Sequence, residues 1–180
     1  GNGGGQQLEM GGCRRPTEKH LSNLAAMKIA LFPGSFDPIT KGHVAVLLSA
    51  LPLFDKIYVA IGVNANKKSL FPLERKKKWI QRCFKNEPKI EVVDYQNLTI
   101  DLCKELGANY IIRGIRNTMD FQYEKDIAHA NKQLNPNVET VFFATTIEHS
   151  HISSSMVRDI YAHHGDCSQF IPDCYDIFEE

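Results

Sequence analysis

The fold is decided by the stretch from Phe32 to His43, which reads F-P-G-S-F-D-P-I-T-K-G-H. Short apolar runs at residues 28–32 and 44–48 lie on either side of it. A strand, a turn rich in glycine and proline, and a helix in that order commonly build a phosphate-binding loop. Gly34 permits a tight turn because it has no Cβ, and His43 opens the expected helix, where free N–H groups and the helix dipole favour an anion. This stretch therefore predicts a binding site for a polyanion.

The rest of the chain alternates short apolar runs with amphipathic segments. Strands are expected at residues 28–32, 56–63, 89–95, 110–113 and 138–144. Helices are expected at residues 42–53, 73–86, 99–106 and 120–134, then from Ser153–Ser155 onward, with a last short helix after Pro172. Unbroken apolar strands separated by helices are typical of a parallel sheet covered on both faces. We expect one α/β domain with a Rossmann-like, doubly wound sheet of five parallel strands.

Polar residues follow four of the five expected strands. These strand ends continue into G-S-F-D, N-A-N-K-K, R-G-I-R and, after the last strand, S-H-I-S-S-S. In a doubly wound sheet, ligands bind beyond the carboxyl ends of the strands. The four ends therefore bring phosphate-binding side chains to one edge of the sheet, and this convergence is stronger evidence than any single motif.

Three segments carry a resemblance to a known family. Residues 34–43 resemble the [T/H]-x-G-H signature of the nucleotidyltransferase superfamily, in the extended form G-[TS]-F-D-P-x-T-x-G-H that is similar to bacterial phosphopantetheine adenylyltransferases. Residues 113–124 match the family pattern R-G-x-R-x-x-x-D-[FY]-x-x-E, and residues 152–155 resemble its triphosphate-binding I-S-S-[ST] motif. The resemblance covers residues 27–178 and implies transfer of the adenylyl group of ATP to 4′-phosphopantetheine, which gives dephospho-coenzyme A and pyrophosphate.

The resemblance also implies roles for individual residues. The catalytic residues would be His43, Lys67 and Arg113, with Lys68 in place of Lys67 if the register of a partly matched lysine motif slips by one. Contacts with 4′-phosphopantetheine would come from Ser35, Lys67, Leu98, Thr99 and Arg113. Contacts with ATP would come from Ser35, Phe36, Gly42, His43, Gly114, Arg116, Glu124, Ser153, Ser154 and Ser155.

The residue types suit this reaction because the acceptor is already an ionised phosphate and needs no protein nucleophile. Histidine, lysine, arginine and serine instead donate hydrogen bonds to phosphate oxygens. Each feature alone also has an ordinary explanation. A histidine or serine at a helix start often caps the helix, and the three lysines at residues 76–78 are more typical of a solvated helix face. It is their combination that favours catalysis.

Two histidine pairs, His149 with His151 and His163 with His164, could suggest a metal site. No aspartate, cysteine or third histidine lies at ligand spacing, so we expect no metal held by the protein itself. A Mg²⁺ ion would be bound through the phosphates of ATP. The segment 148–151 also departs from the family, which often has an aromatic residue there, and this leaves the local nucleotide contacts open.

The composition is that of an ordinary globular domain, with 43% hydrophobic residues and 21 basic against 21 acidic residues in 180. The balanced charge offers no extended field for nucleic acid, and no apolar run approaches the roughly 20 residues of a membrane span. Five cysteines without a C-x-x-C pair, and no secretory apolar segment, favour reduced thiols and a cytoplasmic location. We interpret residues 1–26 as an artificial or disordered leader and residues 27–180 as the nucleotidyltransferase domain.

Two alternatives stay open. The first is another transferase of the superfamily, which would make a nicotinamide dinucleotide or a CDP-alcohol. Cytidylyltransferases usually carry H-x-G-H, however, whereas residues 40–43 read T-K-G-H. The second is a non-catalytic nucleotide-binding module, similar to an electron-transfer flavoprotein subunit, which would copurify with a coloured cofactor. The family resemblance further implies a homohexamer and binding of dephospho-coenzyme A or coenzyme A as product or feedback ligand.

Overall fold

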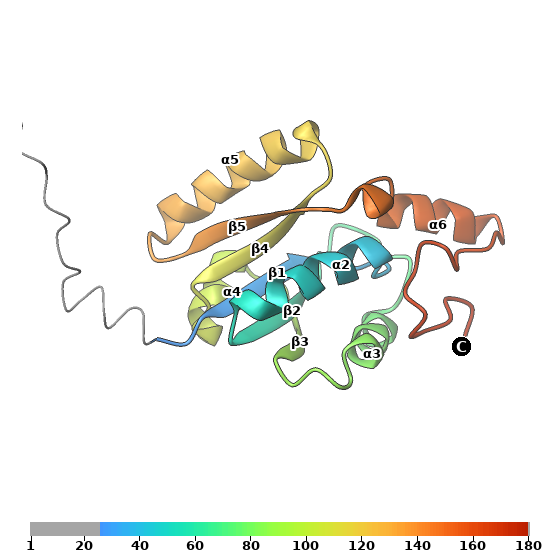
Figure 1. The fold of residues 1–180 in the computed structure, drawn as a ribbon, viewed down its shortest axis with the longest axis horizontal. Helices are drawn as coiled ribbons and strands as arrows, with labels where there is room; N and C mark the ends of the chain where they lie inside the picture. Colours follow the sequence, from blue (N-terminus) through green and yellow to red (C-terminus); the bar gives the residue numbers. More distant parts are fainter. Residues whose placement is uncertain (1–25, 180) are drawn as a thin grey trace, which may run out of the picture.

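Five parallel strands form the sheet that the sequence predicts (Figure 1). The computed structural model describes residues 26–179, so nearly all of the predicted leader, and Cys13, lie outside the described residues. The strand order is β3-β2-β1-β4-β5. Their bounds are β1 (Ile29–Gly34), β2 (Lys56–Gly62), β3 (Ile90–Tyr95), β4 (Tyr110–Ile115) and β5 (Glu139–Ala144). The chain winds outward from β1 in one direction and from β4 in the other, which places the topological switch point between β1 and β4.

Helices cover both faces of this sheet, as expected. Their bounds are α2 (Lys41–Ala50), α3 (Leu73–Cys83), α4 (Thr99–Leu106), α5 (Thr118–Leu134) and α6 (Ser154–Ala162), with 3₁₀ turns at Leu51–Leu53 and Ile147–His149. Successive residues of a strand point to opposite faces. Accordingly, Phe32 packs with residues of α2, α3 and α6, whereas Leu31 packs with residues of α4. No helix among residues 26–179 is long and apolar enough to cross a membrane.

Strands β1 and β4 run further than the sequence predicts. Gly34 still pairs with Ile61 of β2, and Ile115 still pairs with Ala144 of β5. Gly114, which we expected to follow the strand that ends at Arg113, therefore lies within β4. Parallel pairing continues through these polar residues, and this cannot be seen in a hydrophobicity pattern. As a result, the site begins on the sheet itself and not on a flexible connection.

The helix expected after Pro172 is absent, and residues 163–179 form turns that lie beside α3 (Figure 1). The carboxylates of Asp166 and Asp176 accept hydrogen bonds from backbone N–H groups two residues ahead, Ser168 and Phe178, at 2.9 Å. Such turns compete with helix formation. The prediction of a terminal helix is wrong for this reason.

Several contacts hold this C-terminal segment in place. Tyr175 stacks on Trp79 of α3 with ring centroids 4.5 Å apart, and its hydroxyl donates to the carbonyl of Ile39 at 2.6 Å. A disulfide joins Cys83 to Cys174, so the expectation of reduced thiols is wrong for this pair. Cys103 and Cys167 are free and buried. The bonded cysteines are 91 residues apart, and local cysteine spacing gives no sign of such a pairing.

Candidate active site

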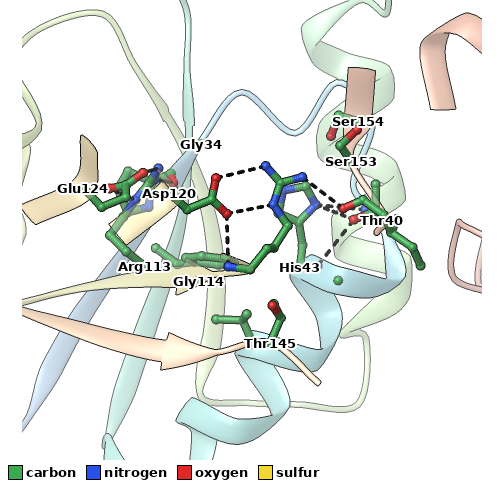
Figure 2. A pocket seen from close by; sticks show the side chains of 16 residues that line it. Gly34, Thr40, His43, Arg113, Gly114, Asp120, Glu124, Thr145, Ser153 and Ser154 are labelled. Atoms are coloured by element: carbon green, nitrogen blue, oxygen red, sulfur yellow. Dashed lines mark hydrogen bonds and ion pairs between the residues drawn. The ribbon is translucent and has the colours of Figure 1, made fainter. Parts of the chain in front are cut away.

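His43 occupies the third position of α2 and takes part in capping that helix (Figure 2). The Thr40 N–H donates to His43 Nδ1 at 3.0 Å, and the His43 N–H donates to Thr40 Oγ1 at 3.4 Å. Because Nδ1 accepts a hydrogen bond, the proton of the neutral ring belongs on Nε2. The capping role that we weighed against a catalytic role is therefore present, and it fixes the tautomer that leaves a donor for a ligand.

The surroundings keep this histidine neutral. Burial, and then the positive charges of Arg113 and Arg116, lower the pKa of His43 from 6.5 to about 4. A neutral imidazole at physiological pH can donate from Nε2 without changing charge during a reaction. The site therefore gains a hydrogen-bond donor, while the two arginines supply the positive charge.

The turn before His43 is shaped by Phe36. This residue has a φ of 44°, in the left-handed region that side chains other than glycine rarely adopt. Its buried ring packs against His43 and Phe32 at centroid distances of 5.0 and 5.5 Å. A Cβ at Gly34 would lie 3.1 Å from the same ring. A side chain at residue 34 would therefore press on the ring of Phe36, and the strained turn is held by the packing of that ring.

Arg113 is held in place by Glu124 of α5 (Figure 2). Its Nε and one terminal nitrogen donate to the two carboxylate oxygens of Glu124 at 2.9 and 2.6 Å, and the other terminal nitrogen donates to the Pro33 carbonyl at 2.6 Å. Glu124 is 8% exposed, so the pair is mostly removed from water. The planar guanidinium is therefore fixed between β1 and α5, beside the switch point.

A second arginine is oriented by the other acidic residue of the motif. The Arg116 backbone N–H and Nε each donate to Asp120 at 3.0 Å, and a terminal nitrogen donates to the Ile152 carbonyl at 3.4 Å. Burial raises the pKa of Asp120, but the hydrogen bonds from Arg116 outweigh it and the pKa lies below its ordinary value. Both arginines of the R-G-I-R segment are therefore oriented by carboxylates of α5.

These residues enclose a cavity of about 240 Å³ at the carboxyl ends of β1 and β4. Of the ten residues expected to bind ATP, seven line it: Gly42, His43, Gly114, Arg116, Glu124, Ser153 and Ser154. Ser35, Phe36 and Ser155 do not. The sequence prediction missed Thr40 and Thr145 among the lining residues. Thr145 directly follows β5, so the rule that ligands gather beyond strand ends could have found it.

The two serines at the start of α6 also have structural partners. Ser153 is the N-cap and accepts from the Met156 N–H at 3.1 Å, while the Ser154 hydroxyl donates to the Pro38 carbonyl at 2.8 Å. The hydroxyl proton of Ser153 and the N–H groups of Ser154 and Ser155 are left to serve an anion. Ser154 instead ties α6 to the turn between β1 and α2.

A second hollow, of about 190 Å³, lies beyond Arg113. It shares four lining residues with the first cavity: Pro33, Gly34, Arg113 and Glu124. It then extends past Tyr95 and Thr99, whose hydroxyls are 3.0 Å apart, to α5. Thr99 thus lies where a second substrate could bind, whereas Leu98 is 60% exposed and does not line this hollow.

Lys67 lies apart from His43. Together with Ser35 and Lys68 it lines a third hollow, of about 520 Å³, formed by residues 62–73 and the turn after β1. The structure therefore joins Ser35 with Lys67, and His43 with Arg113, but the two pairs line different hollows. The sequence could not show this separation, because Lys67 and His43 follow β2 and β1, which are neighbours in the sheet.

The described residues hold no group of three or more histidine, cysteine or acidic side chains that could ligate a metal ion. His149 Nδ1 is 2.8 Å from the Thr146 hydroxyl, and His163 Nδ1 is 2.8 Å from the Asp159 carbonyl. Two members of the histidine pairs are thus engaged in local contacts. The carboxylates beside the cavity, Asp120 and Glu124, are bound to arginines.

The sheet order and the switch point between β1 and β4 define a Rossmann-like α/β fold. The family model described as cytidylyltransferase-like matches residues 31–160. Solved structures with the same fold include a putative nicotinate-nucleotide adenylyltransferase from Vibrio parahaemolyticus, with a TM-score of 0.62 and 18% identity, over 83% of this chain and 96% of that chain. A bifunctional NMN adenylyltransferase/ADP ribose pyrophosphatase from Francisella tularensis also has a TM-score of 0.62, with 16% identity, over 84% of this chain and 45% of that chain. The chain is thus a cytidylyltransferase-like nucleotidyltransferase.

Sequence relatives narrow this class. Phosphopantetheine adenylyltransferase of Flavobacterium psychrophilum is 52% identical over 147 residues, which is 82% of this chain and 97% of the relative. The enzyme of the same name from Cytophaga hutchinsonii is 48% identical, over 81% of this chain and 97% of the relative. The one from Bacteroides thetaiotaomicron is 42% identical, over 84% of this chain and 99% of the relative. The chain belongs to the phosphopantetheine adenylyltransferase family.

The His43→Asn variant separates the two roles of this side chain. The asparagine Oδ1 takes the place of Nδ1 and can still accept from the Thr40 N–H, but the Nε2 donor is lost. We expect kcat to fall about 100-fold or more, while the free energy of unfolding changes by less than about 1 kcal/mol. Steady-state kinetics and urea unfolding measure the two effects. The exposed His129→Asn is the matched control. Near-normal turnover of His43→Asn, or a loss of folding that accounts for its inactivity, would contradict this assignment.

The pKa of His43 also predicts how stability depends on pH. Between pH 6.5 and about 4 the unfolded chain binds a proton at this histidine and the folded protein does not, so the free energy of unfolding falls as the pH drops through that window. His43→Asn removes this contribution. Its free energy of unfolding should therefore decline less steeply than that of the parent protein between pH 6.5 and 4, as measured by urea unfolding at a series of pH values. Parallel curves for the two proteins would contradict a pKa of about 4.

Proposed function

We propose that this enzyme transfers the adenylyl group of ATP to 4′-phosphopantetheine and releases pyrophosphate, a step of coenzyme A biosynthesis. The observation that carries the proposal is the shared wall of two hollows. Arg113, Glu124, Pro33 and Gly34 line both the cavity that contains His43 and the hollow that contains Thr99. A transferase that joins two substrates needs two sites that meet, and the reacting phosphates would meet at Arg113.

We assign ATP to the cavity with His43. The triphosphate would lie against Arg116, Ser153 and the free N–H groups at the start of α6, where arginine and a helix N-terminus both favour anions. His43 would donate from Nε2 to the phosphate group that departs. Glu124, which we expected to contact ATP, acts in this proposal by orienting Arg113.

We assign the acceptor to the second hollow. Its pantetheine arm would pass over Tyr95 and Thr99, and its phosphate would reach Arg113. Ser35 lines the third hollow, on the turn after β1, and would contact this phosphate from there. An oxygen of this phosphate attacks the α-phosphorus of ATP in line. The new P–O bond forms while the bond between the α-phosphorus and the bridging oxygen breaks, and pyrophosphate leaves with the negative charge. No protein nucleophile takes part.

Catalysis then depends on positioning and on stabilisation of charge. Two phosphates repel each other, and fixed donors between them permit the close approach that the reaction needs. Lys67 or Lys68 would add positive charge from the loop beside Ser35 when that loop contacts the substrates. The metal ion would enter as Mg²⁺ bound to the ATP phosphates, since both carboxylates beside the cavity are already paired with arginine.

We further propose that the enzyme is a cytoplasmic homohexamer that binds coenzyme A or dephospho-coenzyme A in the acceptor hollow. Exposed apolar side chains support self-association. Six of the twelve exposed large apolar residues in the described part of the chain lie on α5 or directly before α4: Leu98, Met119, Phe121, Tyr123, Ile127 and Leu134. Clusters of this kind commonly mark protein–protein contacts.

The test is pyrophosphate release from ATP and Mg²⁺ with 4′-phosphopantetheine, nicotinamide mononucleotide or no acceptor in parallel. We expect release with 4′-phosphopantetheine alone. Release with the mononucleotide would leave the role of His43 intact and would show that the acceptor assignment is wrong. A protein that binds ATP and is silent with every acceptor would support a non-catalytic binding module instead.

A further inference from the structure

Lys76 of α3 is a buried lysine, although the sequence suggested that residues 76–78 form a solvated face. Its exposed fraction is 4%. Lys77 is partly exposed and pairs with Asp94 at 2.8 Å, and Lys78 is exposed. A lysine is rarely buried unless it is paired, because removing its charge from water is costly. The interpretation of residues 76–78 as a solvated face is therefore wrong for Lys76.

The ammonium group of Lys76 joins two loops. It donates to the Ser35 carbonyl at 3.0 Å and to the Ser69 hydroxyl at 2.9 Å. Burial lowers the pKa of Lys76, and the nearby charge of Asp37 opposes this change. The same Asp37 carboxylate accepts from the N–H groups of Leu70 and Phe71 at 2.8 and 2.9 Å. One buried cation and one buried anion thus connect residues 35–37 with residues 69–71.

These two loops carry the groups that line the third hollow. Ser35 and Lys67 are exposed side chains, one on each loop, and Lys76 lies in the wall between them. Since neither exposed side chain is rigid by itself, their relative position depends on the buried contacts behind them.

We infer that Lys76 is a positioning residue, which holds Ser35 and the loop bearing Lys67 in the arrangement that receives the acceptor phosphate. The inference rests on the proposed function, because that proposal places Ser35 at the acceptor phosphate and lets Lys67 add positive charge from the loop beside it. The ATP side does not depend on Lys76, since His43, Arg116 and Ser153 are held by other contacts. A defect at Lys76 should therefore act on one substrate more than on the other.

The test compares Lys76→Met with Lys78→Met, its neighbour on the same helix, in the full chain. Methionine fills a similar volume without the charge and the donors. We expect KM for 4′-phosphopantetheine to rise about tenfold in Lys76→Met, with KM for ATP changed less than about threefold, and both values to be unchanged in Lys78→Met. Lys76→Arg keeps a positive charge and donors, so it should restore much of the acceptor KM.

Ser69→Ala decides the matter if Lys76→Met fails to fold. It removes one Lys76 contact at an exposed residue, and we expect an acceptor KM about threefold higher with an unchanged melting temperature. If Lys76→Met folds, the inference is overturned when its acceptor KM stays within twofold of the parent value, or when both KM values rise equally. If Lys76→Met does not fold, an unchanged acceptor KM in Ser69→Ala overturns the inference. A parent enzyme that releases no pyrophosphate with 4′-phosphopantetheine would instead refute the proposed function and this inference with it.

Discussion

The ion pair between Arg113 and Glu124 is the interaction on which the rest of the site depends. Both carboxylate oxygens are used, and the remaining end of the guanidinium reaches the Pro33 carbonyl of β1. The pair therefore fills the gap that opens where the chain winds away from β1 and β4 in opposite directions. Burying a charge is costly without a partner, so Glu124 compensates the positive charge of Arg113 and orients its side chain at this point. The two hollows can then share a single rigid wall.

The turn from Ser35 to Thr40 is stabilised mainly by distant parts of the chain. Lys76 binds the Ser35 carbonyl, Arg158 binds the Asp37 carbonyl, and Ser154 and Tyr175 bind the carbonyls of Pro38 and Ile39. These donors come from α3, α6 and the C-terminal segment. In a turn that binds phosphate, most N–H groups are needed for the ligand and do not bond within the turn. Side chains from distant parts of the chain therefore hold the turn through its carbonyls. The disulfide between Cys83 and Cys174 joins two of these supporting segments.

Sequence reasoning predicted the sheet, and seven of the ten residues expected to bind ATP lie together in one cavity, because both depend on local order. Apolar runs mark strands, and polar residues after strands mark the binding edge. It failed where long-range contacts decide. The Cys83–Cys174 bond joins residues 91 positions apart, and the buried ammonium group of Lys76 binds Ser35, 41 positions away. The turns after Pro172 are a separate error, because an aspartate side chain there binds a nearby backbone N–H group and competes with helix formation. It also could not show that Lys67 and His43 line separate hollows, since strand order says little about the path of the loops between them.

The most direct test of this account is the binding of each substrate to Glu124→Gln. This variant keeps the shape of the side chain and removes the charge that fixes Arg113. Isothermal titration with ATP and, separately, with 4′-phosphopantetheine should show about tenfold weaker binding of both, because one arginine serves both hollows. Glu139→Gln, at an exposed ion pair, serves as the control. Weaker binding of only one substrate, or of neither, would contradict a shared wall at Arg113.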